Sequence, residues 1–179
     1  MIRHFSILLT ALTVLLSSSS CNAQTKAKAP MDNQYIIEDY LKKWKGNKRY
    51  TMKVLEAMPE EHYDFKPVEG MKTFKSQATH IANWLNNHIK KVGHTGLTKV
   101  DTGSKESLMA SFNTIFDELL AYIETLDPDI LSETTRMWYG QSTKSRLMNL
   151  MDNHLTHHRG QLIAYLRLKN IKAPSYVGW

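Results

Sequence analysis

Four stretches of the chain place apolar residues at steps of three and four, the spacing of an amphipathic helix. These stretches span residues 34–58, 76–92, 104–126 and 142–169. The first stripe consists of Ile37, Tyr40, Leu41, Trp44, Leu55 and Met58, with Thr51 at one step. Strict alternation of apolar and polar residues, as in a half-buried strand, is limited to short pieces near 134–138. The pattern predicts an all-α protein with four helices.

Residues typical of helix ends support these boundaries. They are Pro59, Ser76, Ser104, Asp127, Pro128 and Pro174. The connections at 59–75 and 128–142 have no helical period and are long enough to be crossovers. Four amphipathic helices of this length favour a four-helix bundle with two longer crossover connections. We expect the bundle to cover residues 34–174 and a short C-terminal tail to follow at 175–179.

The first 20 residues have the pattern of a secretory signal. Arg3 and His4 precede a largely apolar run at 5–16, and four serines follow at 17–20. The run is shorter than the roughly 20 residues that a helix needs to span a bilayer. We therefore expect residues 1–20 to be a signal peptide and the protein to be exported.

Cys21 is the chain's only cysteine and directly follows this signal pattern. Small residues before such a cysteine resemble a bacterial lipoprotein signal, in which Cys21 is lipidated and becomes the first mature residue. Cleavage after Ala23, which gives a soluble periplasmic or secreted protein, is the alternative. Residues 21–33 are polar and read as a flexible tether. The predicted location is thus the periplasmic side of a membrane, held by an N-terminal lipid anchor.

Composition and charge narrow the classes of function. The 179 residues are 42% hydrophobic and 22% charged, as in one ordinary globular domain. The net charge of +6 permits contact with nucleic acid but does not require it, and the basic residues of the first helix read as a solvated face. We therefore predict no nucleic-acid partner. Because Cys21 precedes the bundle, the domain has no disulfide, catalytic thiol or cysteine-rich zinc site.

Histidines on the apolar stripes are the candidate chemistry. His154 and His158 lie one turn apart on the stripe of the fourth helix, where side chains about 5–6 Å apart can share one metal ion. His80 in the second helix is a candidate third ligand. Burying imidazoles on an apolar face is costly unless their nitrogens are satisfied, and a metal satisfies one nitrogen of each.

The alternative interpretation is that these histidines are hydrogen-bonded core residues, because that is more often the role of a histidine on an apolar face. The spacing of the histidines does not decide between a metal site and core histidines. His157 lies about 100° round the helix from His158 and should face solvent or the surroundings of the site. His88 lies two turns from His80 and is the reserve ligand.

Several familiar enzyme signatures are absent from the sequence. A zincin needs glutamate directly after its first histidine, and Leu155 stands there instead. The predicted helices have no paired Glu-x-x-His motifs of a di-iron site. A nucleophile elbow, a P-loop and a dinucleotide fingerprint are also missing. These classes of enzyme are excluded.

Three segments carry a resemblance to a known family. They are Tyr63-Asp64-Phe65-Lys66-Pro67, Thr79-His80-Ile81-Ala82 and His154-x-x-x-His158-Arg159-Gly160-Gln161. With them the chain resembles the DinB/YfiT-like superfamily of bacterial four-helix bundles over about residues 34–174. The resemblance implies that His80, His154 and His158 are ligands of one divalent metal ion, often zinc or nickel. It also implies a bundle that commonly forms homodimers.

Two classes of function follow from the resemblance. Similar proteins include metal-dependent hydrolases and thiol-dependent S-transferases, so the first class is an enzyme whose metal activates water or a thiol to attack a small-molecule substrate. Low-molecular-weight thiols are chiefly cytosolic, so the predicted export weighs against the transferase. The second class is a non-catalytic envelope module that binds a metal or ligand. Asp152, within one turn of His154, is the nearest carboxylate, but its spacing does not identify a general base.

Overall fold

The structure of the protein is a computed structural model that describes residues 33–178. The predicted signal peptide, the lipidation site Cys21 and the tether up to residue 32 lie outside the described residues. Those expectations therefore stay predictions.

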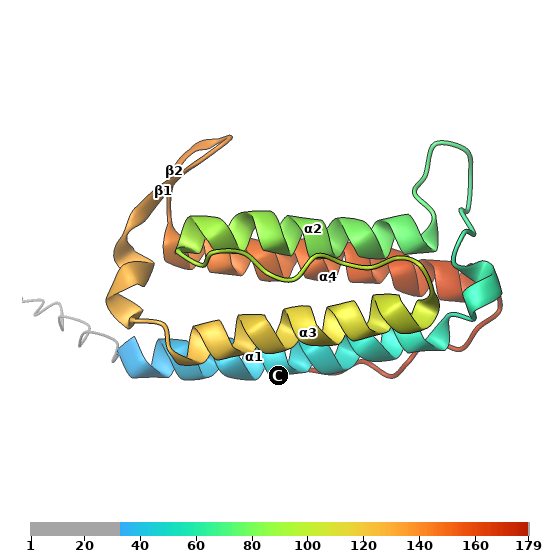
Figure 1. The fold of residues 1–179 in the computed structure, drawn as a ribbon, viewed down its shortest axis with the longest axis horizontal. Coiled ribbons are helices and arrows are strands. Elements are labelled where there is room, and N and C mark those ends of the chain that lie inside the picture. Colours follow the sequence, from blue (N-terminus) through green and yellow to red (C-terminus); the bar gives the residue numbers. More distant parts are fainter. Residues whose placement is uncertain (1–32, 179) are drawn as a thin grey trace, which may run out of the picture. The chain divides into compact units, whose positions relative to one another are not determined.

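Four helices form the body of the fold, as the apolar stripes predict. They are α1 (Asn33–Ala57), α2 (Phe74–Val92), α3 (Lys105–Glu124) and α4 (Lys144–Leu168). Helix α2 packs mainly against α4, and α1 packs against α3 and also contacts α4 (Figure 1). The prediction of an all-α four-helix bundle is confirmed.

The connections between the helices contain short elements of their own. The 3₁₀ helix η1 (Glu60–His62) follows α1, and η2 (Pro128–Ser132) follows α3. The connections at 59–75 and 128–142 are not the predicted crossovers, because each joins two helices at the same end of the bundle (Figure 1). The crossover is the connection at 93–104, which runs back along the length of the bundle, so that α2 and α3 point in the same direction. Helices α2 and α4 therefore run antiparallel, which lets the start of α2 face the end of α4.

The observed caps correct two predicted helix starts. Helix α2 begins two residues early because the Thr73 side chain, rather than Ser76, caps it by accepting a hydrogen bond from the Ser76 backbone N–H. Ser104 caps α3 as predicted and forms a capping box with Ser107. Helix α4 begins after Thr143, because Ser142 belongs to a strand.

A β-hairpin precedes α4, where the sequence indicates only short alternating pieces near 134–138. Strand β1 (Thr134–Met137) pairs antiparallel with β2 (Gly140–Thr143), and Trp138 and Tyr139 form the turn. Gly140 has a φ of +116°, a conformation that favours glycine. Strands of four residues are too short to show a clear period, which is why the alternation is weak. The hairpin projects beyond α2 and α4 at one end of the bundle (Figure 1).

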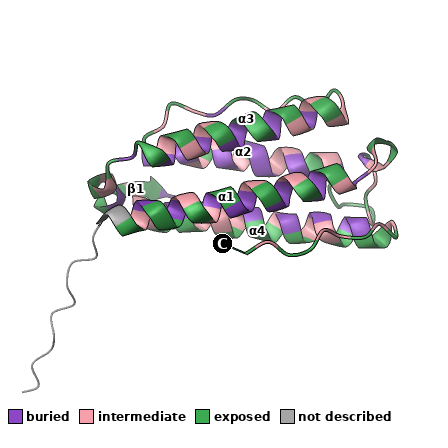
Figure 2. Cartoon of the chain, turned by 90° about the horizontal axis from the view of Figure 1, so that it is seen from below, coloured by how far each residue is buried: buried purple, intermediate pink, exposed green. Residues whose placement is uncertain are grey.

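The core fills the space between the helices. The apolar stripes are buried on the faces that the helices turn toward one another, and the opposite faces are exposed (Figure 2). The largest fully buried side chains include Trp44, Phe74, Phe112, Phe116, Leu55 and Met58. Among the described residues, every helix is too short or too polar to span a lipid bilayer.

Candidate metal centre

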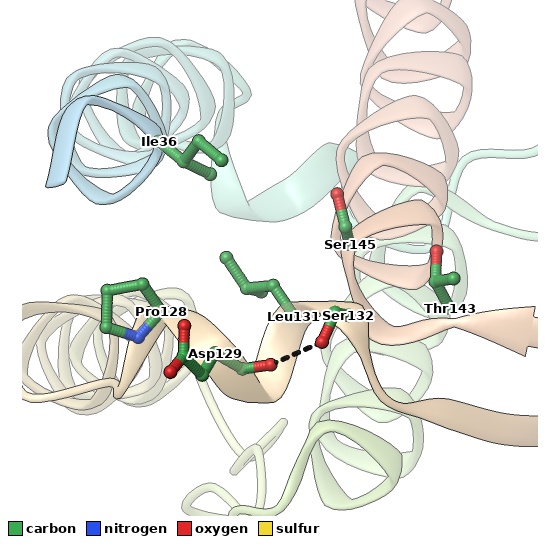
Figure 3. A pocket seen from close by; sticks show the side chains of 7 residues that line it. All are labelled: Ile36, Pro128, Asp129, Leu131, Ser132, Thr143 and Ser145. Atoms are coloured by element: carbon green, nitrogen blue, oxygen red, sulfur yellow. Dashed lines mark hydrogen bonds between the residues drawn. The ribbon is translucent and has the colours of Figure 1, made fainter. Parts of the chain in front are cut away.

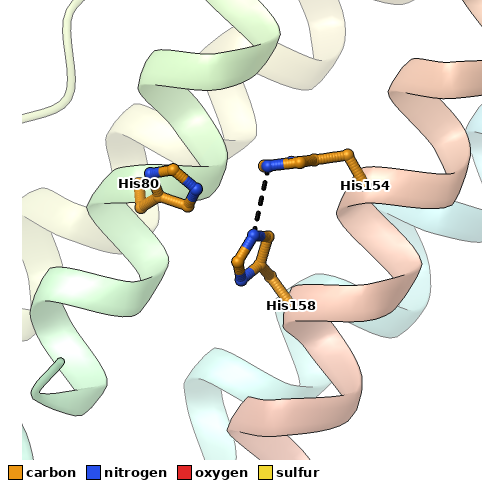
Figure 4. A group of neighbouring side chains, drawn as sticks. All are labelled: His80, His154 and His158. Carbon is orange, nitrogen blue, oxygen red and sulfur yellow. Dashed lines mark hydrogen bonds between the residues drawn. The ribbon is translucent and has the colours of Figure 1, made fainter. Parts of the chain in front are cut away.

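Three histidines from two antiparallel helices meet at one place in the fold. His80 lies on α2, and His154 and His158 lie one turn apart on α4, with their rings between the two helices (Figure 4). One ring nitrogen from each lies within 4.8 Å of the others. All three side chains are half-buried. The predicted ligand set is therefore brought together, and these histidines lie close enough to bind one metal ion.

The spacing of the nitrogens fits the geometry of a tetrahedral metal site. The Nε2 atoms of His154 and His158 are 3.1 Å apart. Zinc binds imidazole nitrogen at about 2.0–2.1 Å, which separates two tetrahedral ligands by roughly 3.3 Å. The pair on α4 thus already has nearly the separation that a shared ion requires, and His80 faces it from α2.

Burial keeps these imidazoles neutral, which is the form that binds a metal. Desolvation is the main cause that lowers the pKa of His154 to about 3, and the neighbouring His158 and His80 lower it further. Desolvation also lowers the pKa of His80, with a smaller contribution from Lys72. The pKa of His158 is lowered by desolvation, although its hydrogen bond with Gln161 acts in the opposite direction.

These shifts predict that the metal-free protein loses stability in mild acid. The unfolded-state pKa of histidine is about 6.5, so as pH falls the unfolded chain takes up protons before the folded protein does. We expect the free energy of unfolding to decrease below about pH 6.5, toward the lowered folded-state pKa of His154. Denaturant unfolding with a chelator at pH 8 to 5 measures this dependence. His154→Leu should make it shallower, and an unchanged slope in that variant would contradict the prediction.

Two glutamines surround His158 on the side away from His154. The Oε1 atom of Gln161 lies 3.2 Å from His158 Nδ1, and its Nε2 atom lies 3.0 Å from Nε2 of His157. Gln77 of α2 is only 2% exposed, and its Nε2 atom contacts both Gln161 Oε1 and His158 Nδ1. When His158 Nε2 faces a metal, the ring proton resides on Nδ1, and this N–H can donate a hydrogen bond to Gln161 Oε1. Gln161 thus fixes the ring and its tautomer.

Removing the Gln161 acceptor should therefore weaken metal binding. We expect Gln161→Leu to raise the dissociation constant for zinc by about 10- to 100-fold, the usual effect of losing a partner of a metal-binding histidine. Gln161→Glu, which keeps an acceptor at this position, should retain tight binding. Competition with a chromophoric chelator measures both, with the exposed Gln141→Leu as control. Equal affinity in Gln161→Leu and Gln141→Leu would remove this role from Gln161.

An indole supports the other side of the centre. Trp84 stacks on His154 with ring centroids 3.9 Å apart and planes 9° apart. It also stacks on His88 at 3.6 Å. The Nδ1 atom of His88 lies 2.8 Å from the Trp84 carbonyl oxygen, so His88 lies behind the indole and outside the group of three. The reserve ligand is thus a neighbour of the site, and the exposed His157 lies at its edge as predicted.

A buried arginine next to His158 connects α4 to α1 by hydrogen bonds. Arg159 is 6% exposed and donates hydrogen bonds to Asn47 Oδ1 at 2.8 Å and to Thr51 Oγ1 at 3.3 Å. Asn47 Nδ2 in turn donates to Asp152 Oδ1 at 2.7 Å, and Lys43 Nζ lies 3.5 Å from Asp152 Oδ2. Asp152 therefore points to α1, and the structure does not place this carboxylate beside the histidines.

Some residues around the three histidines are indicated by the sequence, and others are not. Gln161 and Arg159 lie in the segment that carries the family resemblance, but their contacts were not predicted. Gln77 and Trp84 were missed as parts of the site. The signal available for Trp84 is its position four residues after His80, on the same side of α2. Gln77 shows no comparable signal except its place three residues before His80.

A separate pocket lies elsewhere in the fold and contains no histidine. Its volume is about 390 Å³, and it lies between the start of α1, η2 and the start of α4 (Figure 3). The lining residues are Ile36, Pro128, Asp129, Leu131, Ser132, Thr143 and Ser145. Ser132 Oγ donates to the Asp129 carbonyl oxygen across its floor. None of the lining residues is a histidine, so the pocket adds nothing to the metal centre.

Comparisons with known proteins agree with this fold. The model of the DinB family matches residues 25–169, which include all three histidines. The protein YjoA of Bacillus subtilis (strain 168) is 22% identical over 138 residues, which cover 73% of this chain and 90% of YjoA.

Two crystal structures share the arrangement of the helices. A DinB-like protein from Bacillus cereus ATCC 10987 superposes with a TM-score of 0.67 at 21% identity, over 77% of this chain and 95% of that one. The structure of YjoA superposes with a TM-score of 0.66 at 19% identity, over 79% of this chain and 99% of that one. At these identities the likeness shows a common fold.

Proposed function

Because the chain belongs to the DinB family, we propose that His80, His154 and His158 hold one divalent metal ion, zinc or nickel, and that the centre hydrolyses a small-molecule substrate. The observation that carries the proposal is the convergence of three ring nitrogens from α2 and α4 within 4.8 Å. Three protein ligands leave a fourth tetrahedral position for water or substrate, which is typical of catalytic rather than structural zinc sites.

The bound ion would supply a water of lowered pKa and would polarise the substrate carbonyl. The chain's own residues prepare the site for this chemistry. Neutral imidazoles add no negative charge, so the ion's full charge acts on its open position. When His158 Nε2 faces the ion, Gln161 Oε1 accepts a hydrogen bond from His158 Nδ1–H, and Trp84 stacks on the His154 ring. These contacts preorganise the ligands and reduce the cost of reorganisation when a substrate binds.

The hydrolase is tested by comparing metal-loaded and chelated protein on small esters, amides and lactones. We expect turnover only in the loaded protein, with a rate that rises between about pH 6 and 8 as a metal-bound water ionises. Free metal is held in excess so that occupancy stays constant across this range. Thiol addition to electrophiles is assayed in parallel and identifies an S-transferase instead. Absence of turnover in all assays, together with a closed site, would favour the non-catalytic envelope module.

We also propose that the protein works outside the cytoplasm, held at the membrane by a lipid on Cys21. The support is the order of basic head, apolar run and serines before the chain's only cysteine. Labelling cells with a fatty-acid analogue should mark the wild-type protein and leave Cys21→Ala unmarked. Equal labelling of both proteins would refute the anchor, and cleavage after Ala23 would then define a secreted form.

A further inference from the structure

A row of stacked and edge-on rings runs from the metal centre to the β-hairpin. It consists of His154, Trp84, His88, Trp138 and Tyr139, with successive ring centroids 3.9, 3.6, 6.2 and 4.9 Å apart. At the hairpin end Trp138 is 72% exposed and Tyr139 is 49% exposed. Two adjacent exposed aromatic rings that continue a row of half-buried rings form an apolar surface able to hold a flat ligand.

A pocket of about 340 Å³ lies beside this aromatic row on α4. Its lining residues are Tyr139, Arg146, Asn149, Leu150 and Asn153. Tyr139 belongs to both the row and the pocket, and Leu150 lies one helical turn before His154. The pocket therefore joins the exposed end of the row to the helix that carries two of the three histidines.

The polar groups of this pocket favour a negatively charged ligand. Arg146 is exposed, and its guanidinium makes no ion pair or side-chain hydrogen bond with any residue that the structure describes. The pocket contains two amides and no carboxylate. A guanidinium with free donors matches the planar oxygens of a carboxylate, and the amides can donate further hydrogen bonds.

We propose that the aromatic row and this pocket bind the substrate of the metal centre, and that the substrate carries a flat apolar group and an acidic group. That the ligand is the substrate of the metal centre rests on the proposed function, whereas its binding to the aromatic row and the pocket does not. Arg146 and His154 are eight residues apart on α4, which corresponds to about 12 Å along the helix axis. The substrate should thus present its reactive group roughly this far from its acidic end.

Binding of three simple probes to the zinc-loaded protein tests this assignment. The probes are 2-naphthoate, the neutral 2-naphthamide, and cyclohexanecarboxylate, which has the charge but no flat ring. Isothermal titration should show 2-naphthoate binding about tenfold more tightly than either of the others, because only it uses both the guanidinium and the rings.

Two variants and two matched controls locate the binding. Arg146→Gln should remove the tenfold preference for naphthoate over naphthamide, and Trp138→Ala should weaken both aromatic probes about three- to tenfold. The exposed Arg167→Gln and Tyr35→Ala should bind all probes as the wild type does. Unchanged naphthoate binding in both Arg146→Gln and Trp138→Ala would overturn the proposal.

Repeating the titrations with chelated protein separates this inference from the metal centre. The proposal predicts the same Arg146 effect with and without zinc. If naphthoate binding required zinc and were unchanged in Arg146→Gln, the carboxylate would bind the ion. That result would overturn the proposal that the pocket binds the acidic group. Zinc content, measured on the same samples, tests the metal centre independently of either result. Self-association that Trp138→Ala abolishes, without probe binding, would assign the hairpin to a second copy of the chain and also overturn the proposal.

Discussion

Replacing both His154 and His158 by alanine should abolish stoichiometric zinc binding. The two residues supply neighbouring nitrogens 3.1 Å apart, and His80 alone cannot hold an ion against water. We expect the dissociation constant to rise by well over about 100-fold, more than losing a supporting partner costs. Metal analysis after dialysis against a weak chelator measures the loss, and circular dichroism checks that the variant remains helical.

Two other histidines provide matched controls for this prediction. His157 lies next to His158 but at the exposed edge of the centre, and His62 lies in η1. Alanine at either position should leave about one zinc ion per chain. If the double variant retained its full zinc content, His154 and His158 would be core histidines and the proposed centre would be wrong.

Arg159→Ala should lower the free energy of unfolding by about 3 kcal/mol. The substitution leaves Asn47 and Thr51 buried without their hydrogen-bond donor, and each unsatisfied group costs roughly 1–3 kcal/mol. It also removes the guanidinium from the face of the Tyr50 ring, where its carbon lies 4.8 Å from the centroid. Urea unfolding of the wild type and the variant measures the difference.

The exposed Arg167 on the same helix is the control for Arg159. Arg167→Ala should change the free energy of unfolding by less than about 0.5 kcal/mol, as is usual for exposed positions. Equal effects of the two substitutions would show that the buried hydrogen bonds to α1 contribute no stability of their own.

The sequence predicts the helices well because each apolar stripe repeats at steps of three and four over many residues of one segment. The stripe from Ile37 to Met58 matches the buried face of α1 closely. The predicted start of α2 is two residues late, because Thr73 and Ser76 are both good caps and only the backbone conformation decides between them. The sequence indicates the hairpin only weakly, by the alternating pieces near 134–138, because its two strands have four residues each and bury only Met137 and Ser142.

The site is only partly predictable, because local patterns define contacts within one helix but not contacts between helices. His154 and His158 are a helical pair whose proximity follows from local geometry. His80 lies on another helix, so the sequence offers it only as a candidate third ligand, which the family resemblance supports. The contact of Gln77 with His158 joins residues 81 apart in the chain and depends on how α2 packs on α4. Asp152 is close to His154 in sequence, but it faces α1 because Asn47 and Lys43 bind it there.

Cobalt substitution tests the central claim most directly, because it reports the number, geometry and openness of the site in one titration. We expect the metal-free wild-type protein to bind one cobalt(II) ion per chain, with the visible absorption of a tetrahedral or five-coordinate site. Added azide should shift that spectrum by replacing water at the open position. Absence of cobalt binding at a single site would contradict the three-histidine centre, and a spectrum that azide leaves unchanged would contradict its open position.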